Sequence, residues 1–231
     1  MVFVVNSVKD SSHHHTDSVE QIRSEVTVCT LCKLCQTRTK AVPGEGLTSA
    51  KIMFVGEAPG RNEDREGRPF VGSAGKILED VLQKFGFSRA EVFITNVVKC
   101  RPLGNRIPDD EERSACRDYL DREISVICPE IICILGRTAF ESILGGKSIM
   151  SSRGKFIVRG ERKYFLTIHP AATIYNSKLR SVLEDDIKFL SQEYKKICSQ
   201  NSSLLTDFMS YKIIFYQITT STIFKHSNVI R

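Results

Sequence analysis

The sequence predicts an α/β domain with a parallel sheet between two layers of helices. Three observations support this prediction: short apolar runs, amphipathic segments between them, and Gly/Pro turns where runs end. The apolar runs that we expect to form strands are residues 51–60, 91–100, 129–136 and 164–170. The segments that we expect to form helices are residues 73–87, 108–127, 137–146 and 178–197. Strands that alternate with helices pair in parallel, and the helices cover both faces of the sheet.

Each element has its own local signal. The run KIMFVGEAPG (51–60) ends in a Gly/Pro turn, which is typical of a buried strand that leads into a loop. The run EVFITNVVKC (91–100) is rich in β-branched and apolar residues. The helix at 73–87 has one apolar face and stops at Gly86. The helix at 108–127 begins with proline and acidic residues, which favour a helix N-terminus.

Composition limits the class of protein. The chain has 231 residues, 41% apolar and 26% charged, as expected for one globular domain with tails. No run of eighteen apolar residues occurs, and no basic region precedes the apolar start as in a secretory signal. We therefore expect a cytoplasmic protein without membrane contact, where structural disulfides are rare, so the eight cysteines indicate metal binding. The net charge of +6 permits a polyanionic partner without identifying one.

Composition also divides the chain into three parts. Residues 1–24 are polar and predict a flexible tail, in which three consecutive histidines have no spacing suited to a metal site. Residues 25–198 form the predicted single domain. Residues 199–231 form a C-terminal extension whose role the sequence does not define. Within it, QITTSTIF (217–224) is a weak match to the motif that binds sliding clamps.

Three cysteines stand close together near the start of the domain. Cys29, Cys32 and Cys35 are spaced three residues apart, so either neighbouring pair could supply two thiolates to one metal centre. Two further ligands must come from elsewhere. We prefer Cys100, which ends a predicted strand, and Cys116, which lies on the helix that follows. Spacing does not decide between zinc and a [4Fe–4S] cluster, since both accept four thiolates.

The remaining cysteines have other predicted places. Cys133 lies in an apolar strand and Cys128 lies just before it, so we expect both to be core residues. Cys198 follows the last predicted helix.

Polar residues occur where the predicted strands end. Ligands bind to α/β sheets at the carboxyl ends of the strands. Glu57 follows the first strand, Asn96 lies near the end of the second, and His169 follows the fourth. The loop GEAPGRNEDREGRPFVGSAG (56–75) lacks the GK[ST] of a phosphate-binding loop, and its carboxylates would repel phosphate. The sequence thus predicts a pocket with an acid, a close backbone approach and an aromatic wall.

Several ordered motifs point to one family. They are GEAPG (56–60), GRPFVGSAG (67–75), NVVKCRP (96–102) and HPAA (169–172), preceded by RTKAVPGEG (38–46). Together they resemble family 4 uracil-DNA glycosylases, the thermostable iron–sulfur type of bacteria and archaea. The resemblance covers about residues 25–197.

The resemblance implies a three-layer α/β/α sandwich with a central four-stranded parallel sheet and a [4Fe–4S] cluster. It implies a monofunctional glycosylase that hydrolyses the N-glycosidic bond of deoxyuridine in DNA, and we expect a nucleoid-associated monomer in a prokaryotic cytoplasm. The family's second ligand lies six residues before the Arg of an Arg-Thr pair, here Arg38, which selects Cys32 with Cys29 as its partner. Cys35 then becomes a spare thiol beside the cluster.

The resemblance also assigns contacts to the base, which must be flipped out of the duplex into a pocket. Phe70 suits a stacking wall, worth ~1–3 kcal/mol per base. The Asn96 amide offers a donor and an acceptor that match uracil O4 and N3–H, whereas cytosine has the opposite polarity at both positions. Glu63 is expected near C5 of the base, where it would clash with the methyl group of thymine. The backbone around Ala58 is expected to approach the uracil.

Cleavage leaves negative charge on the uracil and positive charge on the sugar. His169 is expected to donate to uracil O2, and donors of this kind typically contribute ~3–4 kcal/mol. Glu57 is expected to act on water or on the sugar cation. The better-known branch of the superfamily has an aspartate directly after the residue equivalent to Glu57. Here that position is Ala58, which argues against a mechanism with one aspartate as general base.

Other residues are candidates for contacts to DNA. Ile174 or Tyr175, after the histidine motif, could be a wedge that enters the duplex, or could be core. Four basic residues flank the predicted pocket and are candidates for phosphate contacts, which would make binding salt-dependent. They are Arg68, Lys99, Arg101 and Arg106.

Two alternative functions fit the same sequence. The first is a metal-stabilised DNA-binding module without catalysis, which Ala58 keeps open. The second is a related glycosylase with altered base choice, or one that bonds covalently to DNA. The covalent type carries an insert with an extra histidine after the third strand, and residues 142–154 contain none.

Overall fold

The structure is a computed structural model that describes residues 17–197 and residue 199. Its centre is a six-stranded mixed sheet in the order β1-β3-β2-β4-β6-β5. The strands are β1 (Glu45–Gly46), β2 (Ile52–Gly56), β3 (Phe93–Asn96), β4 (Ile131–Leu135), β5 (Phe156–Arg159) and β6 (Arg162–Thr167). The prediction of four strands was therefore two short.

The four predicted strands form the middle of the sheet. β3 pairs with β2, β2 with β4, and β4 with β6, all in parallel. The two additional strands pair antiparallel at the edges, β1 with β3 and β5 with β6. β1 has only two residues, and β5 has three apolar residues but no fully buried one, so neither resembles the buried strands at the centre of the sheet.

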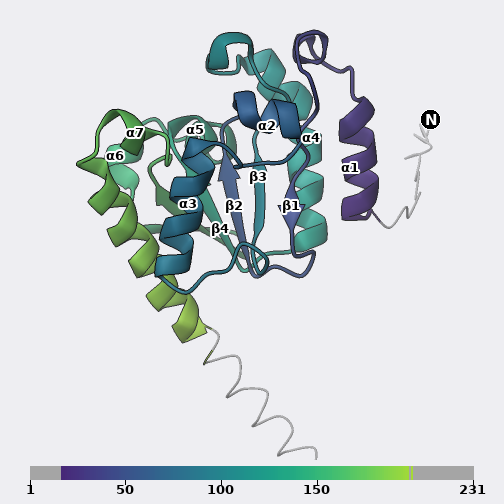
Figure 1. The fold of residues 1–231 in the computed structure, drawn as a ribbon. Coiled ribbons are helices and arrows are strands. Elements are labelled where there is room, and N and C mark those ends of the chain that lie inside the picture. Colours follow the sequence, from purple (N-terminus) through teal and green to yellow (C-terminus); the bar gives the residue numbers. More distant parts are fainter. Residues whose placement is uncertain (1–16, 198, 200–231) are drawn as a thin grey trace, which may run out of the picture.

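Eight α-helical segments cover the sheet in the described part of the chain (Figure 1). They are α1 (Val19–Val28), α2 (Arg61–Glu66), α3 (Ser73–Lys84), α4 (Asp110–Ile127), α5 (Arg137–Leu144), α6 (Ile149–Ser152), α7 (Ala172–Tyr175) and residues 179–197. Two 3-10 turns, η1 (Lys33–Gln36) and η2 (Leu103–Asn105), lie in the loops.

Two apolar cores lie on opposite faces of the sheet. One unites the buried faces of α1, α4 and α5 with the sheet, through residues such as Val26, Leu120 and Phe140. The other unites α3 with residues 179–197, through residues such as Leu82 and Ile187. Helices thus form a layer on each side of the sheet, as predicted for an α/β fold (Figure 1).

The first helix, α1, was not predicted from the sequence. α1 starts at Val19, so residues 19–24 are helical and the predicted tail, residues 1–24, ends too late. The Ser18 side chain caps this helix by accepting a hydrogen bond from the backbone N–H of Gln21 at 3.1 Å. Its buried residues are spaced as on one helical face: Val19, Ile22 and Val26. The segment looked polar because these three apolar positions are embedded among Glu, Gln, Arg and Ser.

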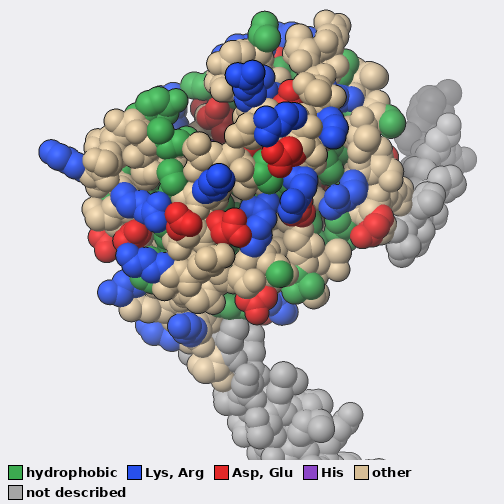
Figure 2. Space-filling model, viewed as in Figure 1, with side chains coloured by type: hydrophobic (Ala, Val, Ile, Leu, Met, Phe, Trp, Pro, Cys, Tyr) green, Lys and Arg blue, Asp and Glu red, His purple; other side chains and the backbone are tan. Residues whose placement is uncertain are grey.

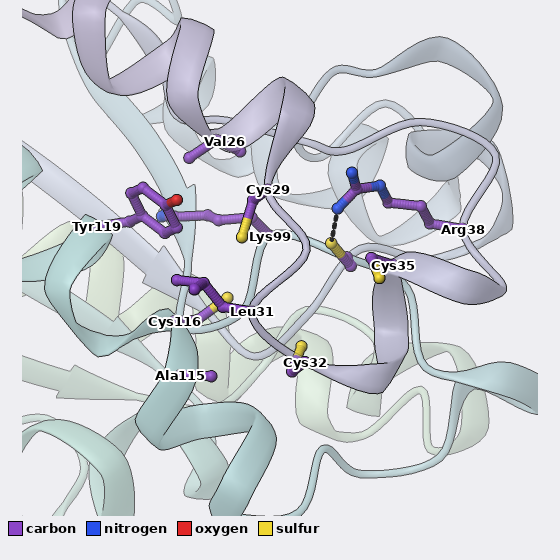
Figure 3. Close-up of a pocket in the computed structure, with 11 residues that line it drawn as sticks. Val26, Cys29, Leu31, Cys32, Cys35, Arg38, Lys99, Ala115, Cys116 and Tyr119 are labelled. Carbon is purple, nitrogen blue, oxygen red and sulfur yellow. Dashed lines mark hydrogen bonds between the residues drawn. The ribbon is translucent and has the colours of Figure 1, made fainter.

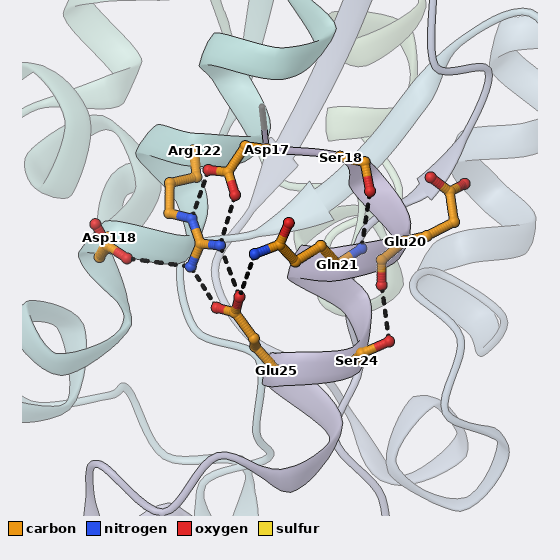
Figure 4. A network of polar contacts seen from close by, with 8 residues as sticks. All are labelled: Asp17, Ser18, Glu20, Gln21, Ser24, Glu25, Asp118 and Arg122. Carbon is orange, nitrogen blue, oxygen red and sulfur yellow. Dashed lines mark hydrogen bonds and ion pairs between the residues drawn. The ribbon is translucent and has the colours of Figure 1, made fainter. Parts of the chain in front are cut away.

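An ionic network fixes α1 against α4 (Figure 4). The Arg122 guanidinium, on α4, donates to both carboxylate oxygens of Asp17 and to those of Glu25. Asp118 lies one turn before Arg122 and adds a longer contact of 3.5 Å. Burial of the apolar face of α1 stabilises its packing against the domain, and the ionic network fixes the position of α1 along α4. The result is a fixed position for Cys29, the residue that caps the C-terminus of α1.

The loops after the parallel strands meet at one edge of the sheet. β2 ends at Gly56, β3 at Asn96 and β6 at Thr167, so Glu57, the 97–102 segment and His169 all emerge there. Among the described residues, every helix is too short or too polar to span a membrane. The weak clamp-binding match at residues 217–224 lies outside the described residues.

Candidate active site

A cavity of about 470 Å³ opens at this edge of the sheet. All six residues predicted to contact or cleave the substrate line it: Glu57, Ala58, Glu63, Phe70, Asn96 and His169. These residues are separated by up to 112 positions in the sequence, from 57 to 169, and the fold brings them to one cavity. Sequence reasoning missed four polar residues of the same lining: Arg61, Asn62, Asn105 and Ser73. The first two stand in the GEAPGRN loop directly after the quoted motif, which was the signal that could have found them.

Asn96 lies at the floor of the cavity. Its side chain is 1% exposed, and its Oδ1 atom has no hydrogen-bond partner among the described residues. A buried acceptor without a partner costs about 1–3 kcal/mol, so such an atom indicates a ligand that supplies the missing donor. Gly56 makes room for this side chain: a Cβ there would lie 2.5 Å from Asn96 Oδ1 and 2.6 Å from Phe70 Cζ.

Phe70 forms a wall next to this amide. It is buried and has a φ of 52°, which is a strained backbone conformation for an aromatic residue. Two neighbours hold it there. The Arg89 guanidinium donates to the Phe70 carbonyl at 3.1 Å, and a Cβ on Gly75 would lie 2.0 Å from the same carbonyl oxygen. Strain that surrounding groups enforce in this way is typical of ligand sites.

His169 stands across from Phe70, with ring centroids 5.7 Å apart. Its Nδ1 accepts a hydrogen bond from the backbone N–H of Ala171 at 3.2 Å. Although the residue lines the cavity, desolvation lowers the pKa of His169 to about 4. The imidazole is therefore neutral at physiological pH and carries its proton on Nε2, where it can act as a donor. Gly136 permits this position, since a Cβ there would lie 2.9 Å from the His169 Cβ.

Glu57 is one of two acids that line the cavity within the described part of the chain. Its backbone carbonyl accepts from the N–H of Val98 at 3.2 Å, which fixes the start of the loop against the end of β3. Among the described residues, no hydrogen bond or ion pair engages its carboxylate. The next residue, Ala58, has no polar side chain and therefore adds no second acid or base at this position. Glu57 is thus an accessible carboxylate at the wall of the cavity.

Glu63 has a more confined setting than the sequence indicated. It is 9% exposed, and its carboxylate accepts three backbone hydrogen bonds, from Gly60 at 3.1 Å, Val71 at 2.9 Å and Gly72 at 2.7 Å. The side chain therefore ties the two arms of the 57–72 loop together. This brace makes the loop a rigid part of the cavity wall.

The cysteines predicted as ligands line a second, smaller cavity (Figure 3). Cys29, Cys32, Cys100 and Cys116 all contribute to its lining, and so does Cys35. In Figure 3 the sulfur atoms of Cys29, Cys32 and Cys116 point into one space, while the Cys35 sulfur lies to the side. Within the described ranges, no three His, Cys, Asp or Glu side chains converge closely enough to hold a single metal ion.

Charge and burial shape this cavity. Arg38 Nη1 donates to the Cys100 sulfur at 3.0 Å, and Nη2 donates to the Thr27 carbonyl at the end of α1. Burial raises the pKa of the Cys116 thiol to about 11 and raises the pKa of Cys100 as well. Burial therefore disfavours the thiolate form of both side chains, and the Arg38 guanidinium partly offsets this effect at Cys100.

Two other cysteine predictions have different outcomes. Cys133 is fully buried in β4, as predicted for a core residue. Cys128 is exposed and ends α4 in the left-handed conformation, with a φ of 47°, so its prediction as a core cysteine was wrong. Cys198 lies outside the described residues.

Comparisons with known proteins agree with this geometry. The family model described as "Uracil DNA glycosylase superfamily" matches residues 43–192. A type-4 uracil-DNA glycosylase of Sulfurisphaera tokodaii is 53% identical over 182 residues, which cover 74% of this chain and 83% of that protein. One from Archaeoglobus fulgidus is 41% identical over 203 residues, covering 84% of this chain and all of that protein. One from Thermotoga maritima is 42% identical over 183 residues, covering 77% and 95%.

The chain belongs to the type-4 uracil-DNA glycosylases. A more distant similarity connects it to the type-5 enzyme of Thermus thermophilus, at 33% identity over 133 residues, covering 51% of this chain and 60% of that protein.

The basic residues predicted to contact DNA in this glycosylase differ from one another in the structure. Lys99 is 1% exposed and forms a buried ion pair with Glu123 at 2.7 Å, so the prediction that it contacts phosphate was wrong. The error arose because a lysine in a basic loop looks solvated, while its side chain turns into the core. Arg68 is exposed and donates twice to Glu45, at 2.8 and 2.7 Å. Both oxygens of that carboxylate are thus occupied.

The other two candidates lie in the loop at the cavity. Arg106 lines the cavity and donates to both oxygens of Glu112, at 2.8 and 2.6 Å. Arg101 is partly exposed and contacts Asn105 Oδ1 at 2.7 Å. Arg61, which the sequence analysis did not select, is exposed at the cavity and has no ion pair among the described residues. Figure 2 shows Lys and Arg side chains spread over the face that carries α2 and α3, with Asp and Glu between them.

The segment after His169 presents two apolar side chains to solvent. Ile174 is 51% exposed and Tyr175 is 90% exposed, both on α7. Tyr175 also lines the cavity. The alternative that these two residues belong to the core is therefore wrong.

Proposed function

We propose that this chain excises uracil from DNA by flipping deoxyuridine into the 470 Å³ cavity and hydrolysing its N-glycosidic bond. One observation carries the proposal: the unpartnered Asn96 Oδ1 and the neutral imidazole of His169 line the same cavity, together with the Phe70 ring. An acceptor, a neutral donor and an aromatic surface are the groups that a planar pyrimidine leaving as an anion requires.

Asn96 selects the base. Its Oδ1 accepts the N3–H of uracil, and its Nδ2 donates to O4. Cytosine offers an acceptor at N3 and a donor at N4, so both contacts would be lost and the buried amide would stay unpaired, at about 1–3 kcal/mol for each group. The Phe70 ring stacks on any base, which contributes ~1–3 kcal/mol without selecting one.

Glu63 excludes thymine through the wall that it stiffens. Three backbone donors fix its carboxylate, so the 57–72 loop resists displacement by a methyl group at C5. A flexible loop would move away from the methyl group of thymine. A rigid loop does not, so the overlap between the methyl group and the cavity wall raises the free energy of thymine binding.

His169 and Glu57 carry the chemistry. The Nε2–H of His169 donates to uracil O2 as negative charge develops there, and the ring contributes this bond without first being protonated. Glu57 orients the attacking water or stabilises the positive sugar. Ala58 supplies its backbone at the base and no side-chain group to the reaction. The described lining of the cavity contains no lysine for a covalent amine step, which favours a monofunctional enzyme.

The cysteine cavity is the proposed site of a [4Fe–4S] cluster held by Cys29, Cys32, Cys100 and Cys116. The four thiolates that bind one zinc ion all lie about 2.3 Å from the same metal. The four thiolates of a cluster bind different iron atoms, so their sulfur atoms would lie farther apart from one another. Four cysteines that line one cavity without converging on a single point fit this requirement. The Arg38 donor at Cys100 suits a thiolate ligand. When bound, the cluster supplies a cross-link between α1, α4 and the 97–102 segment.

DNA is the proposed partner, contacted by Arg61 and Arg101 at phosphates and by Ile174 or Tyr175 at the vacated base position. Arg106 and Arg68 keep this role only where phosphates displace their carboxylate partners. The expected setting remains a nucleoid-associated, cytoplasmic monomer of a prokaryote, with a weak expectation of clamp binding through residues 199–231.

A single assay tests the activity. The protein is incubated with an oligonucleotide that contains one uracil, and alkali then cleaves any abasic site. We expect strand cleavage that depends on the enzyme and on the uracil, with cytosine and thymine oligonucleotides uncut. Cleavage no greater than in the control without enzyme would leave a DNA-binding module without catalysis as the better description.

A further inference from the structure

Lys99 lies between the 470 Å³ cavity proposed to hold the base and the cavity lined by the cysteines. Its side chain is among the largest that are fully buried in the described part of the chain. The ammonium group donates to Thr95 Oγ1 at 2.6 Å, to the Asn96 carbonyl at 2.9 Å and to Glu123 Oε2 at 2.7 Å. An ammonium group has three donors, so all of them are used.

The partner carboxylate is equally well satisfied. Glu123 is 1% exposed, and its Oε2 also accepts from Thr95 Oγ1 at 2.8 Å. Its Oε1 accepts from the backbone N–H of Gly44 at 3.0 Å. A buried ion pair with every donor and acceptor used holds its members in one geometry, and a partly satisfied one does not.

This network ends at the residue that selects the base. Two hydrogen bonds hold the peptide group between Asn96 and Val97. Its N–H, which belongs to Val97, donates to the carbonyl of Gly56 at the end of β2, at 2.9 Å. The Lys99 ammonium holds the Asn96 carbonyl itself. Since no described group binds Asn96 Oδ1, the backbone sets where the acceptor of this amide stands in the cavity.

We propose that Lys99 is a positioning residue for base selection: with Glu123 it fixes the Asn96 peptide, and thereby sets the affinity for uracil. This inference rests on the proposed function. Lys99 also lines the cysteine cavity, next to Cys100 and Cys116. Its partner Glu123 lies on α4, the helix that carries Cys116, so the ion pair connects the cysteine site to the amide that contacts the base.

The decisive variant removes both charges at once. Lys99→Met with Glu123→Leu leaves no unpaired charge in the core. Arg122→Met is the matched control, because Arg122 also joins α4 to another segment through carboxylates but does not contact Asn96 (Figure 4). Thr95→Val is a milder variant that removes one hydroxyl of the network. Iron content, visible absorption and thermal unfolding are recorded for each protein.

The readout is binding of free uracil by calorimetry, together with kcat/KM on a uracil oligonucleotide. We expect the double variant to bind uracil about 10-fold more weakly, the change that corresponds to the loss of about one hydrogen bond. Arg122→Met should lose thermal stability yet keep the wild-type affinity for uracil. Thr95→Val should shift uracil affinity in the same direction as the double variant, by a smaller factor.

The inference is overturned if the double variant and Arg122→Met bind uracil alike. Should the double variant not fold, Thr95→Val decides, and wild-type uracil affinity in that protein refutes the role of Lys99. A wild-type protein that releases no uracil from DNA refutes the proposed function instead. In that case the calorimetric comparison still tests whether Lys99 orders a uracil-binding amide.

Discussion

The backbone N–H of Ala171 donates to Nδ1 of His169 at 3.2 Å, in the turn that leads into α7. A backbone amide can only donate, so Nδ1 must be the unprotonated nitrogen of the ring. The proton of the neutral imidazole is therefore on Nε2. The fold thus sets both the charge and the tautomer of the donor, one by burial and the other by a single hydrogen bond.

The first prediction concerns pH and activity. Because the pKa of His169 is lowered to about 4, the step that depends on it should keep a constant rate between about pH 8 and about pH 5. A histidine with an ordinary pKa of about 6.5 would give an inflection in this range. Single-turnover rates against pH measure this, with His169→Gln as reference and an expected loss of about 10²- to 10³-fold. An inflection near 6.5 that vanishes in His169→Gln contradicts the neutral-donor assignment.

The same group predicts how stability changes with pH. The unfolded chain binds a proton on this histidine near pH 6.5, while the folded protein does so only near pH 4. Its contribution to the free energy of unfolding is thus complete above about pH 6.5 and is lost as the pH falls toward 4. Urea unfolding of wild type and His169→Gln between these values should show a steeper loss in the wild type. Parallel curves would mean that the ring is not desolvated.

A substitution at Asn96 tests base selection. Asn96→Asp replaces the amide donor by a second acceptor, which repels uracil O4 and accepts from the amino group of cytosine. We expect the ratio of uracil to cytosine excision to fall. Asn105→Asp is the control, since it makes the same chemical change in the lining of the same cavity. A variant at Asn96 that is as selective for uracil as the parent refutes the assignment.

The cysteines provide a further pair of variants. Cys29→Ser should lose iron and visible absorption, whereas Cys35→Ser should keep both, because only the first is a proposed cluster ligand. Iron per chain and the ultraviolet–visible spectrum of the two proteins measure this. A colourless Cys35→Ser protein with an intact Cys29→Ser spectrum would reverse the choice. A zinc-containing, colourless wild type would contradict the cluster itself.

Much of the fold was predictable because burial leaves a pattern in the sequence. The four central strands are marked by apolar runs, since both faces of the middle of the sheet are covered, and the long helices have one apolar face each. β1 and the short helices α6 and α7 are too brief to show such a pattern, and the apolar run of β5 is short and partly exposed. Their structure depends on neighbours that the local sequence does not contain.

The site was predictable where a residue type and a motif coincide, as for Asn96, His169 and the cysteines. The sequence did not predict which side chains point into the core and which point to solvent. Lys99 and Arg101 stand two residues apart in the same loop, yet one is buried against Glu123 and the other reaches the surface. The partner of Lys99 is 24 residues away, on a helix, so no local pattern announces it. Cys128 failed for a similar reason: its left-handed conformation turns it outward at the end of α4.

The last prediction concerns Tyr175, whose side chain is 90% exposed at the rim of the cavity. An exposed aromatic residue contributes little to stability, so Tyr175→Ala should unfold at nearly the wild-type temperature. If the ring enters the duplex where the base has left, its loss should slow excision from double-stranded DNA by about tenfold, equivalent to ~1.4 kcal/mol. Single-stranded DNA has no stacked duplex to open, so its rate should change much less. Val158→Ala on β5 is the control, since it truncates another exposed apolar residue away from the cavity lining. Equal slowing on both substrates would assign Tyr175 to the pocket wall rather than to the duplex.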